Sequence, residues 1–234
     1  PPCEECERDE EPTEEALDDA KEDPAHFASK LRQAVAAALG AEADAAAARG
    51  SHAEAEGLLR RCLDSAGPSA SWLEKLGDAL RLQGKLDEAD RTYAAAIALL
   101  DKNETKIAMC LAKRGRALAA QQRYDEARQC YNQACAQYAA SGNERRLAAV
   151  LANLASLYYS QGLYADAEPL YAQSLAIRER VLGPVHPRVA TSLNNLAAVI
   201  DLLGHTQRAY DLCRTSLALC DQLLPPDDPT RLQV

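Results

Sequence analysis

The stretch that decides the fold is Leu151–Pro187, which reads LANLASLYYSQGLYADAEPLYAQSLAIRERVLGPVHP. Two apolar patterns meet in it at a polar break, Gln161–Gly162, and each has the three-and-four spacing of a helix with one apolar face. The first pattern contains Leu151, Leu154, Ala155 and Tyr158, and the second contains Ala167, Leu170, Tyr171, Ser174 and Leu175. A lone helical hairpin leaves half of its apolar surface in water, so this pattern predicts one hairpin of a stack.

The same pattern recurs along the chain. Each unit has an alanine at one position of its second helix, and these alanines are Ala55, Ala89, Ala127, Ala167 and Ala209. The steps between them are 34, 38, 40 and 42 residues, which is the range of helical repeats. The sequence therefore predicts an all-α fold, a right-handed α-solenoid of about five antiparallel helical hairpins.

Small and aromatic residues recur in the same register. The first helices have a small residue where the two helices of a hairpin are expected to cross: Gly77, Gly115, Ala155 and Ala197. Three tyrosines of the second helices are expected to fill the gap between one hairpin and the next: Tyr93, Tyr131 and Tyr171.

These residues resemble the tetratricopeptide repeat, whose pattern places a large residue, Leu-Gly, Tyr, Ala, an aromatic residue and Ala at these offsets. The resemblance covers roughly residues 39 to 224. The last two units are similar to the longer repeats of kinesin light chains and nephrocystin-like proteins, in the words Asn153-Leu154-Ala155, GLYADAEPLY at 162–171 and LGPVHP at 182–187. Units one to three lack the long spacing, and no heptad segment for a motor heavy chain is present. The resemblance implies a superhelix whose first helices line a concave groove.

The chain divides into four parts by composition. Residues 1–23 contain 12 Asp/Glu and 2 Lys/Arg, and this acidic tail is expected to be disordered unless bound. Residues 24–68 form an irregular N-terminal hairpin, with Phe27, Leu31, Val35 and Leu39 on one apolar face and with Gly40 and Gly50 as breaks. The repeat array follows at 69–224. Residues 225–234 are expected to begin a further repeat or form a C-terminal extension, and the start at Pro1 without methionine implies a segment upstream.

Composition also excludes several classes of function. Outside the tail, 23 acidic and 24 basic residues leave the chain near neutral, so nucleic-acid binding has no support. No run of 18 uncharged apolar residues occurs, so no membrane span is expected. Six of the eight cysteines lie in helical patterns, which favours a reducing intracellular compartment: the cytoplasm, or an organelle such as a chloroplast or mitochondrion after removal of a transit peptide.

No group of residues predicts catalysis or metal binding. Cys3 and Cys6 have the spacing of half a metal site, but no second pair completes it, and two exposed thiols are the simpler interpretation. The four histidines are scattered, and the sequence has no glycine-rich phosphate loop between a strand and a helix. We therefore expect no catalytic residue, no metal and no cofactor.

The groove is the expected binding site. The residues predicted to face it from the first helices are Lys75, Arg81, Lys113, Arg116, Asn153, Ser156, Tyr159, Asn194 and Asn195. Lys75, Lys113, Asn153 and Asn195 share one repeat position, and the resemblance implies that this position contacts ligand. The alternative interpretation is that they are ordinary solvated helix residues. For Asn153 and Asn195 that alternative is weaker, because asparagine is a mediocre helix former with no packing reason to be there.

The leading hypothesis is therefore a non-catalytic scaffold, adaptor or assembly factor, acting within a multi-protein complex. Its partner is a protein that presents a peptide or a helix, acidic if the lysines are used. One alternative is a regulatory domain of a larger enzyme, and another is a purely structural role. The acidic tail is also expected to compete for the patch of Lys75, Lys113 and Arg116.

Overall fold

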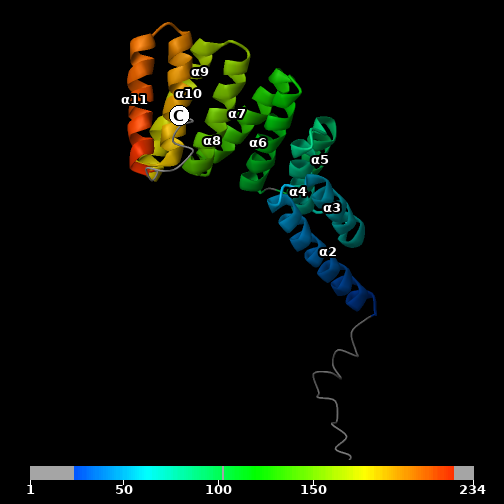
Figure 1. Cartoon of the computed structure of the whole chain (residues 1–234). Helices are drawn as coiled ribbons and strands as arrows, with labels where there is room; N and C mark the ends of the chain where they lie inside the picture. Colours follow the sequence, from blue (N-terminus) through cyan, green and yellow to red (C-terminus); the bar gives the residue numbers. More distant parts are fainter. Residues whose placement is uncertain (1–23, 102, 224–234) are drawn as a thin grey trace, which may run out of the picture. The chain divides into compact units, whose positions relative to one another are not determined.

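Helical hairpins make up the whole of the described structure. The computed structural model describes residues 24–101 and 103–223, and within these residues ten helices and no strands occur (Figure 1). The helices, labelled α2 to α11, pair in chain order into five antiparallel hairpins. The predicted all-α solenoid is thereby confirmed. The expectations for the tail, for Cys3 and Cys6 and for residues 225–234 lie outside the described residues.

The chain divides into two compact units between Pro68 and Ser69. The first unit contains one hairpin, α2 (Pro24–Ala48) and α3 (His52–Ala66). One of the two expected breaks is wrong, because helix α2 runs through Gly40 without interruption. The other is confirmed, because the turn lies at Gly50, which has a φ of +78°.

The apolar face expected on α2 is present but is mostly unpacked. The side chains of Phe27, Leu31 and Val35 are 59%, 56% and 45% exposed, and only Leu39 is buried. Helix α2 has 25 residues and α3 has 15, so about 15 Å of α2 extends beyond its partner. The helical period was identified correctly, but α3 is too short to cover its N-terminal end.

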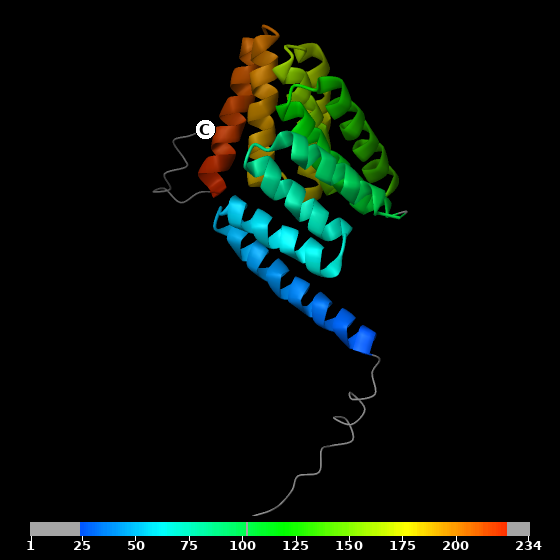
Figure 2. The ribbon, with the colours of Figure 1, turned by 90° about the vertical axis from the view of Figure 1, so that its right-hand side faces the viewer.

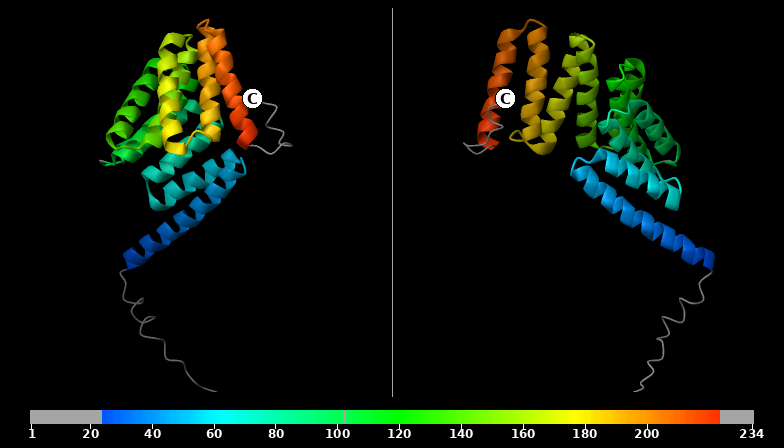
Figure 3. Two further views of the ribbon diagram at one scale, coloured as in Figure 1. Left: turned by 90° about the vertical axis from the view of Figure 1, so that its left-hand side faces the viewer. Right: turned by 45° about the vertical axis from the view of Figure 1, so that its right-hand side comes forward.

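The second unit contains four hairpins, and Figures 2 and 3 show them from other sides. Each hairpin packs against the next through its second helix. In chain order they are α4 (Ala70–Leu82) with α5 (Leu86–Ala98), α6 (Glu104–Ala120) with α7 (Tyr124–Ala140), α8 (Glu144–Ser160) with α9 (Tyr164–Leu182), and α10 (Pro187–Leu202) with α11 (Thr206–Leu223).

The crossing of the two helices explains the glycines of α4 and α6. A Cβ atom on Gly77 would lie 2.6 Å from Cε1 of Tyr93, and one on Gly115 would lie 2.8 Å from Cε1 of Tyr131. The expected close crossing is therefore present. The rings of Tyr93 and Tyr131 lie over the glycines of their own hairpins. Tyr131 and Tyr171 also belong to the same core clusters as residues of the next hairpin, Leu154 of α8 and Leu193 of α10, as the sequence predicts.

A spacing of 26 residues relates the two helices in three of the five hairpins. The Ser174 hydroxyl donates to the carbonyl of Ala148 at 2.7 Å, and that of Ser216 donates to the carbonyl of Ala190 at 3.0 Å. The thiol of Cys62 makes the same contact with the carbonyl of Ala36 at 3.3 Å. Since these hairpins share the spacing, the residues that lengthen the later repeats fall between one hairpin and the next.

The hairpin turns require a left-handed residue. Gly84, Gly162 and Gly204 have φ values of +78°, +75° and +86°, and the α6–α7 turn instead places Gln122 at +61°. A side chain in this region is strained, because Cβ approaches the following carbonyl oxygen. The α6–α7 turn therefore carries backbone strain at Gln122 that the turns with glycine avoid.

The described cysteines are all free thiols, four of them buried, as the helical pattern predicts. Helices of this structure are also too short or too polar to cross a membrane, as far as residues 24–101 and 103–223 are concerned.

Candidate partner-binding face

The first helices of the second unit share one face. Helix α4 approaches α6, and α6 approaches α8, although neither pair is consecutive in the chain. We call this side, formed by α4, α6, α8 and α10, the first-helix face. The predicted site residues lie on these four helices: Lys75 and Arg81 on α4, Lys113 and Arg116 on α6, Asn153, Ser156 and Tyr159 on α8, and Asn194 and Asn195 on α10.

A cluster of charges joins α4 to α6 on this face. The ammonium group of Lys113 lies 2.5 Å from Oε1 of Glu74 and also pairs with Oδ2 of Asp78. The other carboxylate oxygen of Asp78 accepts a hydrogen bond of 2.7 Å from the hydroxyl of Tyr93. The cluster therefore links three helices, and its lysine is only 24% exposed.

The surroundings of Lys113 hold it in the charged form. Burial alone lowers its pKa, but the hydrogen bonds to Asp78 and Glu74 outweigh this effect and raise the pKa above its ordinary value. The ammonium group of Lys113 thus already forms ion pairs with two carboxylates. The expected basic patch of Lys75, Lys113 and Arg116 is interrupted by them, and Lys113 is not a vacant site for an acidic peptide.

The other three cations predicted to bind on α4 and α6 are Lys75, Arg81 and Arg116, and each interacts with an aromatic side chain. The ammonium group of Lys75 is 5.2 Å from the centre of the Trp72 ring. Burial raises the pKa of Tyr93 well above its ordinary range, Asp78 raises it further, and Arg81 lowers it. Burial likewise raises the pKa of Tyr131, and Arg116 opposes that shift. Arg81 and Arg116 are therefore within electrostatic reach of the buried tyrosines.

The predicted residues of α8 and α10 are neutral. Asn153, Asn194 and Asn195 are half-buried, and their side-chain amides make no hydrogen bond to another described residue. Ser156 bonds to Tyr171, whose pKa is raised by burial and lowered by this hydrogen bond. The ring of Tyr159, which is 37% exposed, lies 5.5 Å from that of Tyr164 at an angle of 60°.

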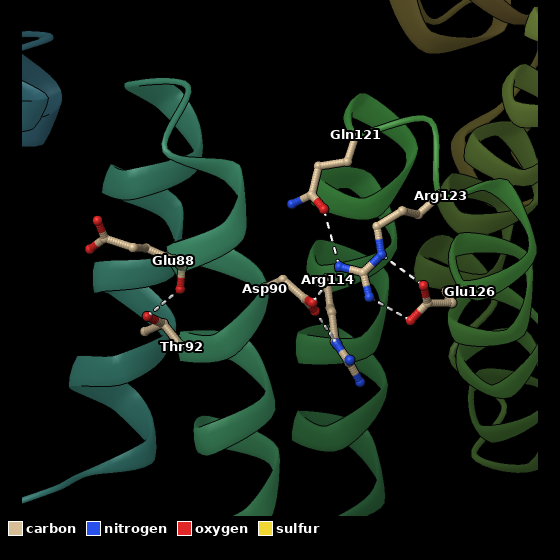
Figure 4. Close-up of polar contacts among 7 residues, drawn as sticks. All are labelled: Glu88, Asp90, Thr92, Arg114, Gln121, Arg123 and Glu126. Carbon is tan, nitrogen blue, oxygen red and sulfur yellow. Dashed lines mark hydrogen bonds and ion pairs between the residues drawn. The ribbon is translucent and has the colours of Figure 1, made fainter.

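Sequence reasoning missed an ion network on the other side of the same junction (Figure 4). Asp90 on α5 is buried and accepts from Arg114 at 2.5 Å and from Arg123 at 2.9 Å. Arg123 also binds both carboxylate oxygens of Glu126, at 2.7 and 2.6 Å. The signal was present, because Asp90 is a charged residue beside Ala89 in an apolar stripe.

The described residues contain no group of three or more His, Cys, Asp or Glu side chains arranged to hold a metal ion.

Several known proteins are similar to this chain. Residues 68–140 and 146–231, more than half of the chain, match the family model for the tetratricopeptide repeat. A curated relative, protein fem-1 homolog C of Homo sapiens, is 35% identical over 69 residues, which span 30% of this chain and 11% of that protein.

Solved structures share the fold over most of the chain. BtubC (BKLC) from P. vanneervenii has a TM-score of 0.70 at 23% identity, covering 92% of this chain and 90% of its own. A putative kinesin light chain from Podosopora anserina with nearly identical TPR-like repeats has a TM-score of 0.68 at 22% identity, covering 84% and 97%. The apo form of RapI has a TM-score of 0.72 at 15% identity, covering 80% and 71%.

The repeated hairpins, the glycines at their crossings and the match over two long segments lead to one conclusion. The chain belongs to the tetratricopeptide repeat family.

Proposed function

We propose that this protein is a non-catalytic scaffold that holds an extended peptide or a helix of a partner protein on the first-helix face. The family's repeats support protein–protein interaction in general. The proposal places the main contact on α8 and α10 rather than on the lysines of α4 and α6. An intracellular, reducing location is proposed with it, and the free thiols support that location.

The observation that carries the proposal is the state of the three asparagines. The side-chain amides of Asn153, Asn194 and Asn195 have no hydrogen bond to a described residue and are not among the buried polar atoms without a partner, so they are open to a bound segment. Each amide offers both donors and an acceptor, which is the set that a peptide backbone complements. Ser156 and Tyr159 lie on the same helix as Asn153 and would contact the flanking residues of the bound segment.

The test is retention of partners by immobilised full-length protein. A variant with Asn153→Ala and Asn195→Ala is compared with the wild type and with Asn132→Ala, which removes an exposed asparagine from the second helix α7. Partners are identified by quantitative mass spectrometry, and the affinity for the retained segment is then measured by titration.

We expect the double variant to lose at least one partner and to bind its segment roughly tenfold more weakly, or about 1.4 kcal/mol. The Asn132→Ala control keeps that partner. If the double variant retains every partner at wild-type affinity, the first-helix face of α8 and α10 is not the binding surface.

A further inference from the structure

Helix α11 has an apolar stripe that is exposed to solvent. Tyr210, Cys213 and Leu217 follow the spacing i, i+3 and i+7 and therefore lie on one face of the helix. All three side chains are exposed, Tyr210 by 61% and Leu217 by 44%. Among the described residues, α10 is the helix that packs extensively against α11, and it contacts the side of Ser216. We call the three exposed residues the end stripe.

In the earlier hairpins of the second unit, the same surface packs against the hairpin that follows. With repeat steps of 38, 40 and 42 residues, Leu217 corresponds to Ile97, Cys135 and Leu175. Ile97 packs against the core cluster of α6, α7 and α8, and Cys135 packs against a cluster of α8 and α9. Leu175 shares a cluster with Leu193 of α10. Helix α11 therefore presents the surface that each preceding second helix of this unit packs against its neighbour.

A second position of the end stripe also faces the following hairpin. Tyr210 corresponds to Glu168 on α9, whose carboxylate pairs with Arg208 on α11 at 2.8 Å. It also corresponds to Asp90 on α5, which pairs with Arg114 on α6 at 2.5 Å. Two earlier hairpins thus use this position for an ion pair across the junction. In α11 the position holds an aromatic ring, which indicates an apolar occupant.

The end stripe is too small for a stable contact between two separate molecules. Such a contact buries about 800 Å² on each partner. A tyrosine side chain buries about 150–250 Å², and the leucine and cysteine side chains are smaller. A segment of the same chain can bind through a smaller area, because its tether gives an effective concentration of the order of millimolar. A tethered segment is therefore favoured over a second copy as the occupant.

The segment that directly follows α11 has a suitable composition. Residues 224–234 read LPPDDPTRLQV. Their three prolines oppose a continuation of α11 and favour a turn followed by extended chain. Leu232 and Val234 are two residues apart, so in an extended chain they lie on the same side. The segment can thus present two apolar side chains together.

We propose that residues 224–234 turn back along α11 and cover the end stripe. Leu217 and Cys213 lie about 9 and 15 Å before the end of α11, at a rise of about 1.5 Å per residue. In an extended chain whose last proline lies beside the end of α11, Leu232 and Val234 lie about 10 and 17 Å from that proline. Leu232 therefore meets Leu217, and Val234 meets Cys213.

This contact goes beyond the proposed binding of partners on the first-helix face. It lies on a second helix and involves none of the asparagines of α8 and α10. Asn153→Ala with Asn195→Ala is therefore expected to leave it unchanged, so either proposal can fail without the other. With the end stripe covered, the last hairpin no longer offers an apolar surface for association between copies.

The experiment measures how fast the Cys213 thiol of the full chain reacts with N-ethylmaleimide, by mass spectrometry of the peptide that contains it. Cys213 is exposed, whereas Cys220 on the same helix is buried and reports whether α11 stays packed. The wild type is compared with the double variant Leu232→Asp, Val234→Asp. The matched control, Thr230→Asp with Gln233→Asp, adds the same charge at polar positions of the same segment.

We expect Cys213 to react about fivefold faster in the double variant than in the wild type, because the tethered segment no longer covers it. The control should react like the wild type, and Cys220 should stay unreactive in every protein. A second variant, Leu217→Ser, removes the α11 side of the contact and should also raise the rate. The wild-type rate should be the same from about 1 to 100 µM protein, because the contact is intramolecular.

Equal rates in the wild type, the double variant and Leu217→Ser would overturn the proposal, because the segment would then leave the end stripe uncovered. A reaction that slows only as the protein concentration rises would overturn it as well, because the occupant would then be a second copy of the chain.

Discussion

In the second unit, the first two hairpins are joined partly by ion pairs, whereas the last two are joined mainly by large apolar side chains. Between α4–α5 and α6–α7, ions contribute on both sides, through Lys113 with its two carboxylates and through Asp90 with its two arginines. Between α8–α9 and α10–α11, large apolar side chains of α10 form the core, among them Val189, Leu193 and Ile200. In this pair of hairpins, the half-buried asparagines of the first helices form no hydrogen bond to another described residue.

Helix α4 shows why the earlier hairpins need these ions. Its buried residues are Leu76, Gly77, Ala79 and Leu80, two of them very small. Helix α10 buries eight residues, including three valine or isoleucine side chains. Because little apolar area is buried by α4, side-chain charges contribute more to holding the first pair of hairpins together.

The largest effect is expected from Gly77→Ala. The new methyl group would lie 2.6 Å from the ring of Tyr93, which is fully buried and bonded to Asp78, so that the ring cannot easily move. We expect a loss of about 3 kcal/mol in the free energy of unfolding, measured with urea. The matching change in the later hairpins, Ala155→Gly, is expected to cost about 1 kcal/mol. An equal loss of unfolding free energy in the two variants would show that the helix crossings at Gly77 and Ala155 are packed equally tightly.

Asp90→Asn is expected to have the next largest effect. It removes the carboxylate that Arg114 and Arg123 share and leaves Arg114, which is 28% exposed, without its partner. We expect a loss of about 2 kcal/mol, below the value for a fully buried pair because the arginines are partly solvated. In the later hairpins, Glu168→Gln removes the exposed pair with Arg208 and should cost less than about 1 kcal/mol. Circular dichroism during urea unfolding compares the two.

Lys113→Met is expected to cost about 1 kcal/mol at neutral pH, because Glu74 and Asp78 then lie close together without a cation. The pKa of Lys113 is raised in the folded state, so its stabilisation is complete below the unfolded value of about 10.4 and is lost as pH rises through the folded value. The difference between the wild type and Lys113→Met should thus be constant from about pH 6 to 9 and decline above about 10.4. Lys106→Met, at an exposed site on the same helix, is the control. A variant as stable as the wild type would mean that the cluster is not structural.

The smallest effect is expected at the turns. Gln122→Gly relieves the left-handed strain at a φ of +61° and should raise stability by about 0.5 kcal/mol, after the greater entropy of glycine in the unfolded chain is subtracted. Gly162→Gln, at the same turn position of the later hairpin, should lower stability by about 1 kcal/mol. Thermal unfolding of both variants provides the measurement. A destabilised Gln122→Gly would show that the glutamine side chain stabilises its turn.

The register of the repeats could be predicted from sequence because it depends on local patterns. The five alanines, the crossing glycines and the hairpin count all follow from helical spacing, and the structure contains them. Contacts between hairpins could not be predicted. Lys113 and Glu74 are 39 residues apart, and periodicity places both on one face without showing that they meet. The same limit explains Phe27, whose pattern indicated an apolar face but not the length of the helix that would cover it.

The 26-residue interval shared by three of the hairpins has a consequence for how such a chain can be re-engineered. Since helix-to-helix geometry is set inside that interval, a hairpin is a self-contained cassette, and changes of length are confined to the connectors. Replacing α6–α7 by a second copy of α8–α9 would keep every contact inside the inserted hairpin. Only the side chains that contact the two neighbouring hairpins would need to change. The residues on the first helices could then be redesigned one hairpin at a time.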